Sequence, residues 1–179
     1  LIEAYIQRLI RESTPEKAVW DMEKVRAGKP TNWNYINGCM MTGLLALTEI
    51  TGDDTYAAFA ESFVGAFVEE DGTIRTFEPS KHTLDDINEG RALFALYETT
   101  GKEKYRKAAD LLMAALKNQP RTFEGNFWHK EIYPNQVWLD GIYMAMPFYA
   151  LYEKTYGAGD YSDILSQIDT VEKRMRDPV

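Results

Sequence analysis

Two aspartates occupy equivalent places in a sequence that repeats itself. Asp140 lies eleven residues before Leu151, and Asp85 lies eleven residues before Leu96. If the repeats form equivalent helices, both carboxylates reach the same end of the structure. Two neighbouring carboxyl groups can split their pKa values, so that one donates a proton near neutral pH while the other stays ionised. This is the chemistry of sugar hydrolysis and of related acid–base catalysis.

A structural role for the two aspartates is the alternative that the residues leave open. An aspartate at a helix start accepts hydrogen bonds from free backbone N–H groups and opposes the positive end of the helix dipole. Trp33, Tyr35 and Trp138 are predicted in the same end layer. These aromatic neighbours favour catalysis, because a helix cap does not require them. Asp86 adjoins Asp85, but the repeat count selects Asp85 as the partner of Asp140.

Polar residues near the two aspartates complete the predicted site. His129, in the stretch GNFWHKEIY, precedes Asp140 by eleven residues and is either a substrate contact or a structural histidine. Arg91, in the same predicted helix as Asp85, can pair with a carboxylate of the protein or of the substrate. The full set of predicted substrate-binding residues is Tyr35, Trp33, Asn88, Arg91, His129, Trp138 and Tyr143.

Three segments align with one another and define the elements that must position these residues. They are LTEITGDDTY (47–56), LYETTGKEKY (96–105) and LYEKTYGAGDY (151–161). Mostly apolar helices are predicted at 35–51, 83–100 and 140–156, ending at Gly52, Gly101 and Gly157, the residue type suited to a left-handed C-cap. Helices with charges on one face follow at 53–68, 102–118 and 160–175. The repeats are therefore hairpins of an inner and an outer helix.

The remaining segments add little regular structure. A further outer-type helix is predicted at 14–27, because Thr14 and Pro15 suit the N-cap and first helical positions. Strand signals are confined to EEDGTIRTF (69–77), where Asp71-Gly72 can close a small hairpin. The fold class is predicted as all-α, with α/α hairpin repeats in an open solenoid or a closed toroid. The aromatic inner helices favour closure around a sugar-sized cavity.

Composition excludes several classes of function. The net charge of −8 over 179 residues argues against nucleic acid, whose phosphates attract a basic surface. No apolar run reaches the length that spans a bilayer, so no membrane partner is expected. One cysteine and two histidines make a metal site unexpected, and no cofactor is predicted. We expect a cytoplasmic protein, and a signal peptide stays possible because the chain starts at Leu1.

Four segments carry a resemblance to a known family. NWNYING, HTLDDINEGRALFALYETTG, EGNFWHK and QVWLDGIYMAMPFYALY closely resemble the unsaturated rhamnogalacturonyl hydrolases, relatives of the unsaturated glucuronyl hydrolases. The resemblance implies an (α/α)6 barrel enzyme of bacterial pectin degradation. Such enzymes release 4,5-unsaturated galacturonic acid from the non-reducing end of rhamnogalacturonan oligosaccharides by hydrating the C4=C5 bond.

The resemblance also implies residue roles. Asp140 corresponds to the general acid/base and Asp85 to its partner, while His129, Tyr35 and Trp138 correspond to residues that face the acidic oligosaccharide. No cofactor is implied.

Members of that family are about twice as long as this chain. Residues 1–179 are therefore predicted to form a single domain, the N-terminal portion of an α/α toroid. We expect the missing C-terminal half of the barrel, or a second copy, to cover its open edge. The sequence leaves two alternative functions open. One is a non-catalytic α/α-repeat module that binds a glycan or peptide, and the other is an inverting glycosidase on the same barrel.

Overall fold

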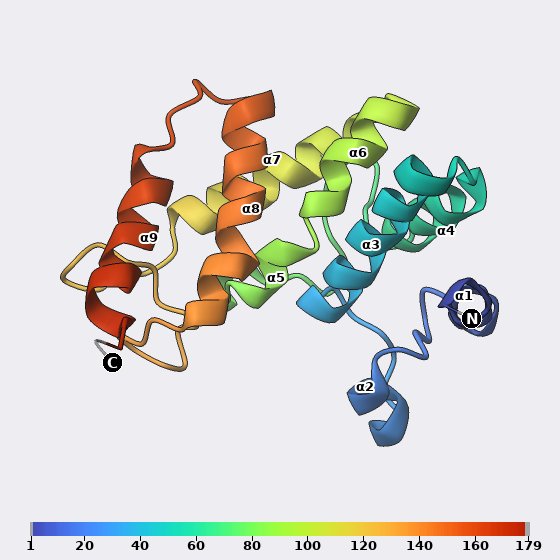
Figure 1. Cartoon of the computed structure of the whole chain (residues 1–179), viewed down its shortest axis with the longest axis horizontal. Helices are drawn as coiled ribbons and strands as arrows, with labels where there is room; N and C mark the ends of the chain where they lie inside the picture. The colour runs from blue at the N-terminus through green and yellow to red at the C-terminus, as the bar shows by residue number, and fades with distance from the viewer. Residues whose placement is uncertain (1, 178–179) are drawn as a thin grey trace.

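A computed structural model describes residues 2–177 of the chain, and in this part the regular structure is helical (Figure 1). The helices are α1 (Ile2–Glu12), α2 (Met22–Ala27), α3 (Tyr35–Thr51), α4 (Asp54–Gly65), the 3₁₀ turn η1 (Pro79–Lys81), α5 (Asp85–Asn88), α6 (Arg91–Thr100), α7 (Glu103–Lys117), α8 (Leu139–Thr155) and α9 (Ser162–Met175). Among these residues, β-pairing is limited to isolated bridges, and none of the helices is long and apolar enough to cross a membrane. The all-α prediction is confirmed.

Three antiparallel hairpins, α3/α4, α6/α7 and α8/α9, stand side by side in the described chain (Figure 1). The inner helices α3, α6 and α8 run in the same direction, so their N-termini lie at one end of the arc. The short helix α5 sits at that end and contacts both α3 and α8. The predicted division into inner and outer helices is therefore confirmed, and α5 links the inner helices at the end where the aspartates lie.

Glycine ends two of the three inner helices as predicted. Gly52 follows α3 with φ 72° and Gly101 follows α6 with φ 66°, both in the left-handed region. The third prediction is wrong: Tyr156 follows α8 with φ −130°, and Gly157 is not among the glycines with positive φ. The longer loop before α9 instead places Gly159 in that region, at φ 74°.

The middle inner helix is not continuous, in contrast to the helix predicted at 83–100. Around Glu89 and Gly90 the amides bond three residues back instead of four, for example from Leu93 N–H to Gly90 C=O at 3.1 Å. A side chain at Gly90 would have its Cβ 2.4 Å from Leu112 Cδ1 and 2.9 Å from the ring of Phe148. Glycine permits this close approach of α7 and α8, and the chain tightens there into two short helices, α5 and α6.

The prediction of a helix at 14–27 is also wrong for the first half of that segment. Residues 14–20 form turns, because the Ser13 and Thr31 hydroxyls accept the Val19 and Ala18 amides at 3.0 and 2.9 Å. Such side-chain bonds compete with helical ones. Helix α2 starts only after Asp21, whose carboxylate accepts from the Lys24 N–H at 3.1 Å.

The predicted turn at 69–77 is present as a small hairpin. Val68 and Ile74 form an antiparallel bridge, and Gly72 adopts φ 89°. The Glu69 N–H donates to Thr73 C=O at 2.9 Å. This hairpin brings Thr76 back to the start of α3.

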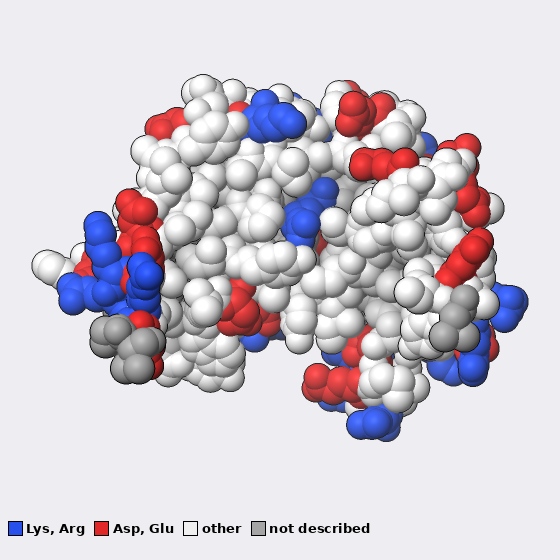
Figure 2. All heavy atoms as spheres, viewed as in Figure 1, with Lys and Arg blue, Asp and Glu red and all other residues white. Residues whose placement is uncertain are grey.

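Most of the inner-helix aromatic residues fill the space between layers and do not line a cavity. Phe148 is fully buried, and Phe94 packs against both Phe148 and Tyr156 with ring centroids 5.5 and 5.6 Å apart. The prediction of an aromatic lining is therefore wrong for these residues. The face that α3, α6 and α8 present to the viewer is largely uncharged, with a basic group near its centre (Figure 2).

Candidate active site

The structure brings the two repeat-equivalent aspartates together at the common end of the inner helices. One carboxylate oxygen each of Asp85 and Asp140 and one ring nitrogen of His129 lie within 4.8 Å of one another. Asp85 is the first residue of α5, and Asp140 is the second residue of α8. Asp86, the neighbouring candidate, is not part of this cluster among the described residues.

Neither aspartate caps its helix. Trp138 precedes α8 and Leu84 precedes α5, and at both starts no side chain bonds the free backbone amides. The capping alternative therefore lacks the hydrogen bonds that it requires. Both carboxylates do stand in the first turn of a helix, where the dipole favours negative charge.

Asp85 is held in place by two side chains from one loop. Lys130 Nζ lies 2.6 Å from Asp85 Oδ2, and His129 Nε2 lies 3.4 Å from Oδ1. The Asp85 side chain is only 15% exposed, whereas Asp140 is exposed. The arrangement thus pairs a fixed carboxylate, whose charge is balanced by Lys130, with a carboxyl group that faces solvent.

His129 forms the floor of the cluster and is 1% exposed. Burial lowers the pKa of His129 below its ordinary value of about 6.5, although the charges of Asp85 and Asp140 oppose this shift. The neutral imidazole is therefore favoured near neutral pH. A Cβ at Gly141 would lie 3.0 Å from His129 Nδ1, so glycine allows the start of α8 to approach the ring.

Trp138 forms an aromatic wall beside this floor. Its indole stacks on His129 with centroids 4.3 Å apart and planes 10° apart, and on Tyr133 at 5.2 Å. Trp138 remains 39% exposed, so the wall can still contact a ligand. A flat apolar surface of this kind suits the ring of a sugar.

A cleft of about 630 Å³ opens beside Asp85. Its lining residues are polar for the most part: Asn32, Asn34, Tyr35, Thr76, Ser80, Lys81, Thr83, Asp85, Asp86, Lys130, Glu131 and Ile132. Tyr35 is 37% exposed at its wall. Lys81 and Lys130 supply positive charge in a chain that is acidic overall.

Asp86 and Glu131 add two further carboxyl groups to this cleft. Burial, reinforced by the neighbouring charge of Asp85, raises the pKa of Asp86 to about 7, while Lys81 and Lys130 oppose the shift. Glu89 is fully buried one turn further on, and burial raises its pKa well above the ordinary value. Acids with raised pKa values therefore lie at both ends of α5.

Two predicted substrate-binding residues are buried and cannot reach a ligand. Trp33 is 0% exposed, and its indole N–H donates to the Asp86 C=O at 2.7 Å. Asn88 is also 0% exposed and lies between α3 and α8, where it donates to the Tyr143 C=O at 3.5 Å. The reason is the same for both residues: their polar atoms form hydrogen bonds inside the protein, next to the site.

Arg91 of α6 and Tyr143 of α8 form a pair, and Tyr143 lies three residues after Asp140 in the same helix. Arg91 Nη1 donates to the Tyr143 hydroxyl at 2.9 Å, and the guanidinium lies over the same ring at 5.2 Å. Tyr143 is 47% exposed. The pair remains a candidate ligand contact.

Sequence reasoning missed Lys130, Thr76 and Asn34 as residues of the site. Lys130 follows His129 directly, so a basic residue beside a candidate histidine was an available signal. Thr76 carried no signal, because only the tertiary fold brings the 69–77 hairpin to the start of α3.

A metal ion does not fit the carboxylate cluster well. Two carboxylates and an imidazole are donors that metals accept. Here the Lys130 ammonium already contacts Asp85 at 2.6 Å and supplies the positive charge that a cation would bring. Lys130 therefore occupies the place beside Asp85 that a metal ion would need.

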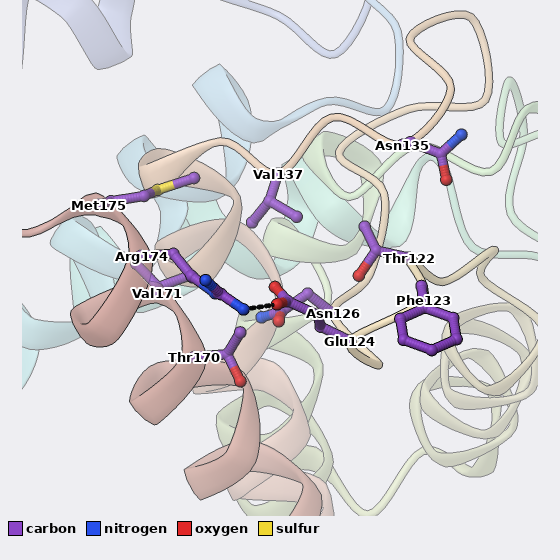
Figure 3. A pocket seen from close by; sticks show the side chains of 10 residues that line it. All are labelled: Thr122, Phe123, Glu124, Asn126, Asn135, Val137, Thr170, Val171, Arg174 and Met175. Carbon is purple, nitrogen blue, oxygen red and sulfur yellow. Dashed lines mark hydrogen bonds and ion pairs between the residues drawn. The ribbon is translucent and has the colours of Figure 1, made fainter.

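A second pocket, of about 520 Å³, lies between α9 and the loop before α8 (Figure 3). Glu124 and Arg174 form an ion pair within it, while Val137, Val171 and Met175 supply apolar contacts. It contains no member of the carboxylate cluster. The Asp85 cleft is therefore the better candidate for catalysis.

Comparison with known proteins shows similarity to glycoside hydrolases. Residues 5–179 match the family Glycosyl Hydrolase Family 88. A solved structure of a glycoside hydrolase from family 105 of C. acetobutylicum ATCC 824 is similar, with a TM-score of 0.79 and 39% identity. The similarity covers 88% of this chain and 45% of that chain, so this chain spans less than half the length of its relative.

Proposed function

The chain belongs to Glycosyl Hydrolase Family 88, and we propose that the protein releases 4,5-unsaturated galacturonic acid from the non-reducing end of rhamnogalacturonan oligosaccharides. The observation that carries the proposal is the Asp85–His129–Asp140 cluster, with its reactive atoms within 4.8 Å. The motifs that resemble unsaturated rhamnogalacturonyl hydrolases supply the choice of substrate.

In the proposed reaction, Asp140 is the acid and then the base. Protonated Asp140 donates its proton to C4 of the unsaturated sugar, and positive charge develops at C5 beside the ring oxygen. A water molecule adds at C5 and returns a proton to Asp140. The resulting hemiketal opens to a C5 ketone, and the hemiacetal freed at C1 expels the remaining oligosaccharide as an alcohol. One water molecule is consumed overall.

Asp85 is the ionised partner in this scheme. Its contacts with Lys130 and His129 hold it in one position, and its negative charge stabilises the cation that develops at C5. Lys81 and Lys130 are the basic residues of the cleft that can contact the substrate carboxylate. In the free protein they pair with Glu78 and Asp85, and Glu131 adds a further carboxyl group to the lining.

The spacing of the carboxylates disfavours an inverting glycosidase. Such enzymes separate the two groups by about 6.5 to 9.5 Å to admit a water molecule between them and the sugar. One oxygen of Asp85 and one oxygen of Asp140 lie within 4.8 Å of each other, which is a closer approach than this separation. Hydration of a double bond does not require that separation between the two carboxylates.

Substrate selectivity must come from the sugar that follows the unsaturated ring. Elimination makes C4 planar, so unsaturated galacturonic and glucuronic acids become the same ring. The cleft beside Asp85 cannot distinguish them by that ring alone. We propose that the open face of α3, α6 and α8 is covered by further barrel helices, or by a second copy, which complete the neighbouring subsite.

The decisive experiment offers the full-length protein three oligosaccharides. The first ends in the unsaturated sugar linked to rhamnose, the second in the same sugar linked to an amino sugar, and the third is saturated. We expect the ultraviolet absorbance of the double bond to fall with the first and fall more slowly with the second. The saturated oligosaccharide should yield no released uronic acid, as measured by chromatography.

Two results would contradict the proposal. Cleavage of the saturated oligosaccharide would indicate a direct glycosidase. Saturable binding of the first oligosaccharide without loss of absorbance would indicate a non-catalytic binding module.

A further inference from the structure

The chain that leads into α3 is held by side chains from two other segments. The Trp33 N–H donates to the Thr76 hydroxyl at 2.8 Å, and the next amide, Asn34 N–H, donates to Glu89 Oε2 at 2.8 Å. Two consecutive backbone amides are thus bonded by side chains that lie 43 and 55 residues away in sequence. The residue that follows is Tyr35, at the wall of the cleft.

Thr76 makes its contact from a strained backbone. It adopts φ 66° at the third position of a turn that the Phe77 N–H closes onto the Ile74 C=O at 3.2 Å. That position normally takes glycine, and a β-branched residue with positive φ is an outlier. Backbone geometry alone would favour glycine here, whereas threonine supplies the hydroxyl that bonds Trp33.

Glu89 holds the second amide from a buried position. It is 0% exposed, and its other oxygen has no hydrogen-bond partner. A Cβ at Gly38 would lie 2.6 Å from Glu89 Cα, so α3 and the end of α5 meet at backbone contact. Glu89 therefore ties the start of α3 to the segment that carries Asp85.

We propose that Thr76 and Glu89 are positioning residues, which fix Asn34 and Tyr35 against the Asp85 cleft and thereby set the affinity for the sugar. Asn34, Tyr35, Thr76 and Asp85 all line this cleft. The inference rests on the proposed function for its substrate. It does not make Thr76 or Glu89 a catalytic residue, because neither is part of the carboxylate cluster.

The critical variant is Thr76→Gly, because it relieves the strained backbone while it removes the hydroxyl. Glycine adopts φ 66° without strain, which offsets part of the stability lost with the hydrogen bond to the Trp33 N–H, so the melting temperature should fall only slightly. Loss of the hydroxyl frees the start of α3, so KM for the unsaturated oligosaccharide should rise about 3- to 10-fold, the equivalent of one net hydrogen bond. The kcat should change less than about twofold, because α5 and α8 still carry Asp85 and Asp140.

Conservative variants and a matched control sharpen the test. Thr76→Ser keeps the hydroxyl and should recover most of the affinity. Glu89→Gln keeps an oxygen for the Asn34 N–H and should resemble wild type, whereas Glu89→Met should raise KM. Gln167 is the control, since it is 2% exposed and its Oε1 accepts from the Phe127 N–H at 3.0 Å, away from the cleft. Gln167→Met should lower the melting temperature and leave KM unchanged.

Hydrogen exchange separates this inference from the proposed function. Mass spectrometry of the peptide that covers residues 32–37 should show faster exchange in Thr76→Gly than in wild type. If wild type binds the oligosaccharide without turnover, the proposed function fails and calorimetric affinities replace KM. An unchanged KM or affinity in Thr76→Gly, an equal rise in Gln167→Met, or no binding by wild type would overturn the inference.

Discussion

The starts of α3 and α8 hold equivalent places in two repeats but are built for different purposes. At α3 the Asn34 side chain accepts from the Asn37 N–H at 3.1 Å, which caps the helix. At α8 no side chain caps the helix, and Asp140 stands exposed in its first turn. A helix start that needs a cap thus has an amide, while the carboxylate at the other start is left free to react.

The start of α5 lies between these extremes. Asp85 is placed like Asp140, yet it is bonded by Lys130 and approached by His129. Asp86, one residue further, has a pKa raised to about 7 by burial and by Asp85. All three carboxyl groups occupy first turns of helices, so the differences in their surroundings come from the segments that contact them.

The largest effect that the comparison predicts is on catalysis at α8. Asp140→Asn in the full-length protein should lower the rate of absorbance loss by about 10² to 10⁴, as expected for a general acid/base. The melting temperature should stay close to wild type, because Asp140 is exposed and caps nothing. Near-normal turnover in this variant would remove the functional contrast between the two helix starts.

The second prediction concerns Asp86 and pH. Because its folded pKa of about 7 exceeds its unfolded value of about 3.9, the folded state binds more protons between these limits. The free energy of unfolding should therefore fall as pH rises from about 4 to 7, on the order of 2 to 4 kcal/mol from this group. Asp86→Asn should remove that part of the slope in urea titrations at pH 5 and pH 8. Parallel slopes in the two proteins would contradict the assignment.

A third prediction tests the close approach at the start of α8. Gly141→Ala places a methyl group 3.0 Å from His129 Nδ1 and 3.3 Å from Leu84 Cδ1. His129 is stacked on Trp138 and has little room to move, so its contact with Asp85 should be disturbed. We expect turnover to fall about tenfold, as small misplacements of catalytic groups commonly cost. Gly43→Ala is the matched control, because a Cβ there would meet nothing within 4 Å, and it should leave turnover unchanged.

The smallest effect is expected at the start of α3. Asn34→Ala removes the side chain that caps α3 but keeps the backbone N–H that donates to Glu89. The free energy of unfolding should therefore fall by about 1 kcal/mol. Urea denaturation measures this loss. Asn34→Asp should restore most of it, since aspartate is an equally good cap. A loss of several kcal/mol from Asn34→Ala would mean that this residue does more than cap α3.

Several parts of the fold could be predicted because their signals are local. Helical periodicity and terminal glycines located the hairpins, and Gly52 and Gly101 take the left-handed cap as expected. The spacing from the repeat leucines identified Asp85 and Asp140, which the structure brings within 4.8 Å. These signals depend on backbone geometry that a few neighbouring residues decide.

Other parts could not be predicted, because distant segments supply the deciding contacts. The division of the middle inner helix at Gly90 follows from the approach of Leu112 and Phe148. Trp33 was expected at a ligand, yet its indole bonds the Asp86 C=O inside the protein. The turns at residues 14–20 depend in part on Thr31, which accepts the Ala18 amide.

The inner and outer helices and the pair of aspartates at one end follow from periodicity and repeat spacing, which are properties of the local chain. The surroundings of each carboxyl group depend instead on how distant segments pack. Burial raised the pKa of Asp86, Lys130 held Asp85, and solvent reached Asp140. The physical reason is that desolvation and charge–charge contact act through space, between segments whose separation in sequence says nothing about their distance.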